Sequence, residues 1–205
     1  MAILLPSVPW NRAYPQIMDE GISVSRSGGR AVSYVEFEDP YWQVNVISQP
    51  LKQAERKLLE AFISKCKRGM VTVHFVPTDV CIPRFYWGDK NNAALTNTGL
   101  ITAITNRTVI SFNSVTTGLT IKDGDLIGLT VGDYNYIVRA CADAVAVASA
   151  ITNLPVDPPL PSYITVGAVV TFKDPKMNMR YVPGSFSMPD ENFPVARFTL
   201  TEVPK

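Results

Sequence analysis

The stretch YWQVNVISQPLKQAERKLLEAFISKCKRGMVTVHFV, from Tyr41 to Val76, decides the fold of this chain. Its first nine residues alternate in character, with Trp42, Val44 and Val46 on one face and polar residues on the other, which predicts a half-buried β-strand. Its last seven, Met70–Val76, are rich in β-branched and aromatic residues and predict a second strand. Between these two predicted strands, the apolar residues recur at a different spacing.

That middle segment, from about Leu51 to Lys67, has the clearest helical pattern in the chain, because its apolar residues recur at three- and four-residue spacing. Pro50 stands at its start, where a missing N–H costs nothing, and Gly69 supplies a left-handed stop at its end. The residues expected on its buried face are Leu51, Ala54, Leu58, Phe62, Ile63 and Cys66.

Upstream, the run Ala31–Ser48 is strand-like on both sides of Pro40 and predicts a β-hairpin. Within it Glu36 and Glu38 alternate with apolar residues, so both are expected on the polar face of one strand. The 30 residues before this run are rich in proline and predict no regular element.

From about Gly88 the chain becomes rich in Asn, Thr, Gly and Val, and it predicts five or six short strands at the spacing of a small barrel. The proline-rich stretch Pro155–Pro161 is expected to be too irregular for a strand. Strand-like runs after the barrel, at Met179–Val182 and Pro194–Val203, need a partner sheet, and the first part of the chain is the one available.

We therefore expect a mainly β protein with one helix, in which a β-sandwich carries an inserted small β-barrel. Residues 1–87 and 174–205 form the first domain in this prediction, and residues 88–173 form the insertion.

Composition excludes several classes of function. Nineteen Lys and Arg against 18 Asp and Glu give 205 residues a net charge of +1, which argues against sequence-specific nucleic-acid binding. No apolar run has the length of a membrane span or the pattern of a signal peptide, so no membrane insertion is expected. Three cysteines, an odd number, predict reduced thiols and synthesis in a cytosol.

No group of residues predicts catalysis. His74 is the only histidine, and the Cys81 thiol could meet it, but neither stands in a known catalytic signature. Asp123-Gly-Asp125 has the start of a calcium loop, yet Ile127 and Tyr134 occupy positions where that loop needs oxygen ligands, so a hairpin turn is expected. We predict no catalytic, metal-binding or cofactor-binding residues, and a hydrolase is the weakest hypothesis.

The aromatic cluster Phe85, Tyr86 and Trp87 has two interpretations. Large side chains at this point are expected to pack a junction between the domains. Alternatively, exposed aromatic rings could stack on sugars or on single-stranded bases.

The order of these elements resembles the distal tail proteins of long-flexible-tailed bacteriophages. Short runs carry the resemblance through their order and spacing: Trp42, Ile47–Leu51, Lys67–Gly69, Lys122–Leu126, Pro158–Leu160, Met179–Tyr181 and Phe198–Glu202.

The resemblance implies a tail-tube-like β-sandwich with an inserted, OB-like barrel, assembled as a homohexameric ring in the tail tip or baseplate of the virion. Such a ring is made in the host cytoplasm, needs no cofactor, and joins the tail tube protein to the tail-tip hub protein. Its strands surround a channel for DNA, and Glu36 and Glu38 would then line that channel and repel phosphate. The alternative function is a carbohydrate-binding module that contacts the host surface through the inserted barrel.

Overall fold

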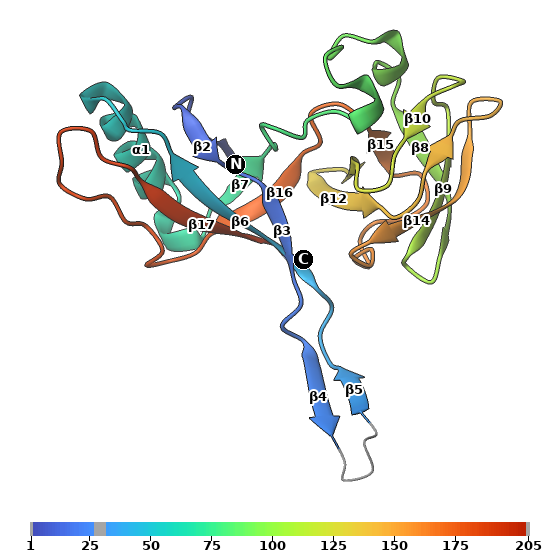
Figure 1. Cartoon of the computed structure of the whole chain (residues 1–205), viewed down its shortest axis with the longest axis horizontal. Helices are drawn as coiled ribbons and strands as arrows, with labels where there is room; N and C mark the ends of the chain where they lie inside the picture. Colours follow the sequence, from blue (N-terminus) through green and yellow to red (C-terminus); the bar gives the residue numbers. More distant parts are fainter. Residues whose placement is uncertain (1, 27–31, 204–205) are drawn as a thin grey trace.

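A computed structural model describes residues 2–26 and 32–203 of the chain (Figure 1). Within these residues the chain is mostly β with a single α-helix. A sheet and a closed barrel lie side by side, and a two-stranded hairpin projects away from both. The predicted fold class, a mainly β protein with one helix and an inserted small barrel, is confirmed.

The larger sheet has seven strands. Its order is β1 (Ile3–Leu4), β7 (Thr72–Phe75), β16 (Met177–Tyr181), β17 (Arg197–Glu202) and β6 (Tyr41–Ser48), and both β2 (Trp10–Arg12) and β3 (Pro15–Met18) pair along the far edge of β6. All pairs are antiparallel except β1 with β7. The first 18 residues, for which no element was expected, thus supply both edges of the sheet.

One face of this sheet holds its core. Alternation along β6 buries Trp42, Val44 and Val46, as the sequence predicted. Register places Phe198 beside Val46 and Leu200 beside Val44, so the central strands share one apolar face. Helix α1 (Gln53–Lys65) covers it through Phe62, whose ring centroid lies 5.9 Å from that of Phe198.

The helix is shorter than predicted and turned differently. Leu51 is buried but precedes α1, and the buried helical residues are Leu59 and Phe62, followed by Cys66 at the C-cap. Successive residues differ by about 100° around a helix axis, so burying Leu59 turns Leu58 outward, where it is 54% exposed. Ala54 is likewise exposed, so these two of the six predicted face residues are wrong.

The predicted hairpin Ala31–Ser48 is also wrong. Strand β5 (Val32–Glu36) pairs with β4 (Ile22–Arg26), whereas β6 pairs with β17, β2 and β3. The chain between Glu36 and Tyr41 therefore connects the projecting hairpin to the sheet and is not a turn between paired strands.

The closed barrel has six antiparallel strands, one more than an OB fold. They are β8 (Gly99–Thr105), β9 (Val109–Asn113), β11 (Leu126–Val131), β12 (Tyr134–Ala140), β14 (Ile151–Asp157) and β15 (Val169–Thr171). A short pair, β10 (Thr120–Ile121) with β13 (Ala144–Val145), lies beside them, and single 3₁₀ turns are η1 (Lys67–Gly69), η2 (Arg84–Tyr86) and η3 (Ala93–Leu95).

Strand β14 continues through Pro155, where the sequence predicted irregular chain. Pro155 is paired with Val109, and its carbonyl accepts the N–H of Cys141 at 2.9 Å. A proline lacks only the donor, so it can remain in a strand where its own nitrogen needs no partner.

The chain enters and leaves the barrel at one place. The N–H of Asp174 donates to the carbonyl of Cys81 at 2.7 Å, and the Asp174 carboxylate pairs with the Lys90 ammonium at 2.9 Å. All six barrel strands lie between Gly99 and Thr171, and all seven strands of the sheet lie outside that range.

Replacement of Phe62 by Ala should lower the free energy of unfolding by about 3–5 kcal/mol, because it removes a buried ring from the contact between α1 and the sheet. Leu58→Ala is the matched control and should change stability by no more than about 0.5 kcal/mol. Urea denaturation of both variants measures the difference, and equal losses would contradict this orientation of the helix.

Candidate functional site

The projecting hairpin, which we call the arm, comprises residues 21–26 and 32–37 of the described chain (Figure 1). Among the described residues its two strands pair only with each other. At its neck the Gly21 carbonyl accepts the N–H of Phe37 at 2.9 Å, and a Cβ on Gly21 would lie 2.5 Å from the carbonyl oxygen of Glu38. Only glycine fits there without a shift of the backbone.

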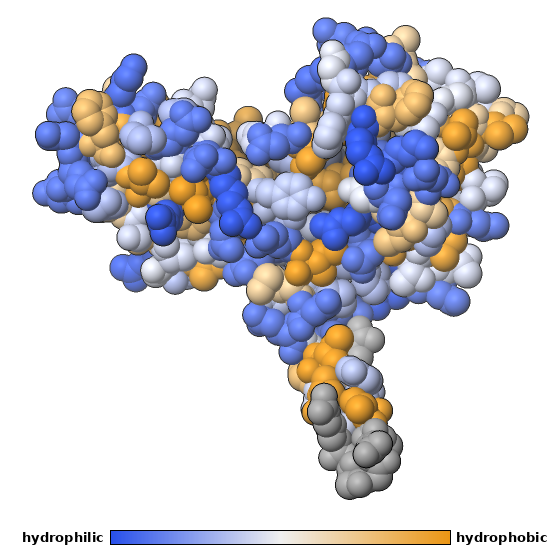
Figure 2. All heavy atoms as spheres, viewed as in Figure 1, coloured by the Kyte–Doolittle hydropathy of each residue, from blue (hydrophilic) through white to orange (hydrophobic). Residues whose placement is uncertain are grey.

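The arm is strongly apolar, and Figure 2 shows hydrophobic residues gathered along it. Register pairs Val24 with Tyr34, so their side chains share one face. Six large apolar side chains of the arm are between 43% and 70% exposed: Ile22, Val24, Val32, Tyr34, Val35 and Phe37. Isolated two-stranded hairpins are marginally stable in water, and apolar patches of this kind mark interaction sites.

The arm changes the interpretation of the predicted channel residues. Glu38 is exposed at its base, and the side chain of Glu36 lies outside the described residues. Val35 and Phe37, the apolar residues that alternate with these acids, are 56% and 67% exposed because the arm carries them away from the sheet.

The second face of the sheet is polar. Gln43 and Asn45 of β6 lie beside Thr201 and Thr199 of β17, and the Thr199 hydroxyl donates to the Asn45 side-chain oxygen at 3.1 Å. None of these four side chains is buried. This face, rather than the predicted hairpin, is the polar surface that the central strands present.

The junction aromatics divide into two kinds. Tyr86 is buried, and its hydroxyl accepts the N–H of Thr120 in β10, beside the barrel, at 3.0 Å. Phe85 and Trp87, on either side, are 59% and 60% exposed. The prediction of a packed junction is therefore right for Tyr86 and wrong for its two neighbours.

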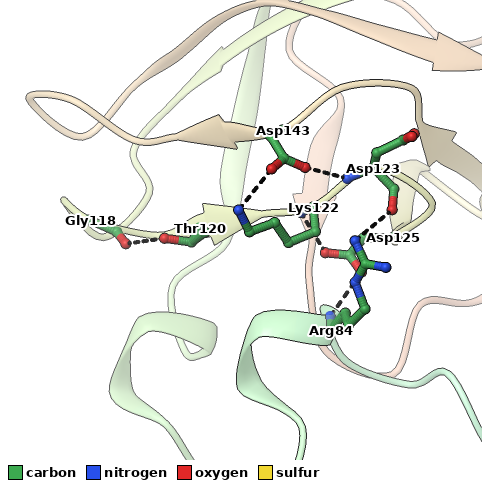
Figure 3. Close-up of polar contacts among 7 residues, drawn as sticks. All are labelled: Arg84, Gly118, Thr120, Lys122, Asp123, Asp125 and Asp143. Atoms are coloured by element: carbon green, nitrogen blue, oxygen red, sulfur yellow. Dashed lines mark hydrogen bonds and ion pairs between the residues drawn. The ribbon is translucent and has the colours of Figure 1, made fainter.

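Asp125 fastens this connection to the barrel (Figure 3). Its carboxylate is buried and accepts two backbone N–H groups, from Arg84 at 2.8 Å and from Lys122 at 2.7 Å. Asp143 reinforces the same turn by accepting the N–H of Asp123 and the ammonium of Lys122. The Asp123–Asp125 turn is thus held by protein donors. The predicted hairpin is wrong, because β10 and β11 on either side of this turn pair with other strands and not with each other.

Trp42 joins the sheet to the barrel. Its side chain is fully buried, and its indole N–H donates to the Ile137 carbonyl in β12 at 2.7 Å. The guanidinium of Arg139 lies 5.4 Å from its ring centroid, within the range of a cation–π contact. Nearby, Arg107 of the barrel pairs at 2.7 Å with Asp39 of the sheet unit, which is the part of the chain that carries the seven-stranded sheet and α1.

A cleft of about 770 Å³ opens beside this contact. The sheet unit lines it with Tyr41, Glu202 and the exposed acids Glu38 and Asp39, and the barrel lines it with Arg107, Ser162 and Tyr163. The sequence indicated only Glu38 among these residues. They come from separate segments that share no local motif, so no pattern could have identified them as one site.

Glu202 is the unusual acid of this cleft. Burial raises the pKa of its carboxyl to about 7, although the N–H of Trp42 donates to it at 3.0 Å and favours the charged form. Asp39 raises the pKa further by repulsion. Glu202 is therefore a titrating group at the contact between the sheet unit and the barrel.

His74 and Cys81, the two groups considered for catalysis, lie on different segments. His74 lies in β7 and Cys81 in the connection that follows, and the structure describes no hydrogen bond between them. Burial raises the pKa of the Cys66 thiol to about 11, which keeps it protonated and unreactive. Over residues 2–26 and 32–203 there is no cluster of three His, Cys, Asp or Glu side chains suited to a metal, and no helix with the length and apolar character to cross a membrane.

No protein-family model and no curated protein matches this chain.

Replacing Asp125 by Ala should destabilise the barrel connection, because two backbone N–H groups lose their acceptor in a buried position. The expected cost is roughly 1–3 kcal/mol for each amide left unpaired. Asp123→Ala is the control, since the Asp123 side chain is exposed and makes no hydrogen bond to the described residues. Similar denaturation midpoints for the two variants would contradict the role given to Asp125.

The pKa of Glu202 makes stability depend on pH. Below its ordinary pKa of 4.5 the group is neutral in both states. Between pH 4.5 and about 7 the unfolded chain ionises while the folded chain keeps the proton, so stability falls across this window and levels off above it. Glu202→Gln should remove roughly 1–2 kcal/mol of this decline, after allowance for partial solvent exposure. Urea midpoints at acidic and mildly alkaline pH measure it, and a Glu202→Gln variant with the wild-type slope would contradict this role of Glu202.

Proposed function

We propose that this protein is a structural subunit that assembles with copies of itself into a ring at the distal end of a bacteriophage tail. In this proposal the ring is a homohexamer of the tail tip or baseplate, made in the host cytoplasm, and it joins the tail tube protein to the tail-tip hub protein. Its role is structural and not enzymatic.

The observation that carries the proposal is the arm. Six large apolar side chains stand in solvent on a hairpin that packs against no other described strand. Burying such a surface requires a second molecule, and an arm on one subunit that fits a different surface of the next gives a head-to-tail contact that can close into a ring.

The polar face of the sheet supports the same proposal. In a ring whose wall is built from the sheets of adjacent subunits, the helix-covered face would lie outward and the Gln43, Asn45, Thr199 and Thr201 face would line a water-filled channel. Those side chains hydrogen-bond readily with water. The exposed Arg180, which is paired with Thr201, and Arg197 lie on the same face and are the groups there that would contact DNA phosphates. The proposed channel wall therefore differs from the one expected from the sequence, because Glu38 lies at the base of the arm and not on this face.

The purified full-length chain should form a ring, visible by negative-stain microscopy and measurable as an oligomer by light scattering. Replacing Tyr34 and Phe37 together by Ser should shift the protein to monomer while its thermal unfolding changes little, because both side chains are mostly exposed within one chain. Leu58→Ser is the matched control: Leu58 is also exposed, but it lies on α1, away from the arm.

A wild-type protein that stays monomeric at every concentration tested would contradict the proposal. So would an oligomer that survives the Tyr34 and Phe37 substitutions. A closed ring with a central hole, lost in the arm variant and kept in the Leu58 control, would support it.

A further inference from the structure

The cleft between the sheet unit and the barrel has the chemistry of a ligand site, independently of assembly through the arm. Its volume of about 770 Å³ is in the range of pockets that hold small ligands, which often lie where two folded units meet. Both units contribute side chains to it, so its shape depends on their fixed contact through Trp42.

Tyr163 gives the cleft a fixed aromatic surface. It is half-buried, and its ring packs against Tyr134, with centroids 5.3 Å apart, and edge-on against Tyr136 at 6.4 Å. An aromatic face is apolar and carries partial negative charge, so it attracts the C–H groups on the flat face of a pyranose ring.

The polar groups around Tyr163 are held in place. Arg107 is fixed by two contacts, to the Asp39 carboxylate at 2.7 Å and to the Leu160 carbonyl at 2.6 Å. The Glu202 carboxylate is oriented by the Trp42 N–H on one oxygen. Carboxylate acceptors, guanidinium donors and the hydroxyl group of Ser162 together match neighbouring sugar hydroxyls, each of which both donates and accepts.

Charge determines which sugar fits best. Three carboxyl groups, on Glu38, Asp39 and Glu202, line the cleft with one guanidinium, which Asp39 already pairs. Because Asp39 neutralises Arg107, the excess of negative charge comes from Glu38 and, above its pKa of about 7, from Glu202. It repels carboxylated and phosphorylated sugars and attracts an ammonium group. We propose that the cleft binds a hexose, and that it prefers a 2-amino hexose to a hexuronic acid.

The test is a calorimetric titration of the full-length protein with D-glucosamine, D-glucose, D-glucuronate and, as a charge-only probe, methylammonium. Glucosamine should bind more tightly than glucose, and glucuronate and methylammonium should bind most weakly. Tyr163→Ala should weaken glucosamine binding about tenfold or more, which corresponds to 1.4 kcal/mol, while Tyr163→Phe should preserve it. Glu202→Gln should remove the advantage of glucosamine over glucose.

Trp87→Ala is the control, because Trp87 is an exposed aromatic residue outside the cleft. Thermal unfolding checks that every variant is folded. The proposal is overturned if none of the sugars binds the folded wild type, if Tyr163→Ala binds glucosamine as the wild type does, or if methylammonium binds as well as glucosamine. Loss of binding in Trp87→Ala with full binding in Tyr163→Ala would place the sugar at the junction aromatics instead.

Discussion

Trp42 is the residue on which the arrangement of the molecule depends. It stands at the start of β6, fully buried, and its indole N–H reaches a main-chain carbonyl of the barrel. A buried indole that lost this acceptor would leave a polar group without a partner, so the hydrogen bond fixes where the barrel sits on the sheet as well as how strongly it is held. The backbone N–H of the same residue donates to Glu202, and thus one position links the central strand, the barrel and the cleft.

The second constraint acts on the connections. A chain that leaves one folded unit, forms a barrel and returns must keep its two crossings close together, and here Cys81, Lys90 and Asp174 hold them side by side. Asp125 then ties the incoming segment of that connection, at the 3₁₀ turn η2, to the barrel itself. With the crossings fixed and Trp42 buried, the barrel is held at more than one point, which gives the cleft a defined shape.

The arm has the opposite character. Its strands have only each other as partners among the described residues, and its apolar side chains face solvent. Apolar side chains stabilise the core of the sheet, and the same residue types on the arm favour binding to another molecule. Burial of apolar area is favourable whether the covering surface belongs to the same chain or to a second one. The rigid part of the molecule therefore accounts for its fold, and the arm accounts for the proposal that it assembles.

The sequence by itself determined the elements whose pattern is local. The alternation of Trp42, Val44 and Val46 predicted the central strand and its buried face, and the spacing of apolar residues predicted α1. The chain's return to the first sheet through β16 and β17 also followed from the sequence, since strands after a closed barrel need a partner.

Tertiary structure alone decided which strands pair. The sequence of β5 is equally compatible with β6 or β4 as its partner, because an alternating strand specifies its faces and not its neighbour. It also decided that Leu59 rather than Leu58 faces the sheet, and it assembled the cleft from Tyr41, Arg107, Tyr163 and Glu202. Residues that are distant in sequence form one site only after the packing of other, buried side chains has fixed the positions of the surfaces that carry them.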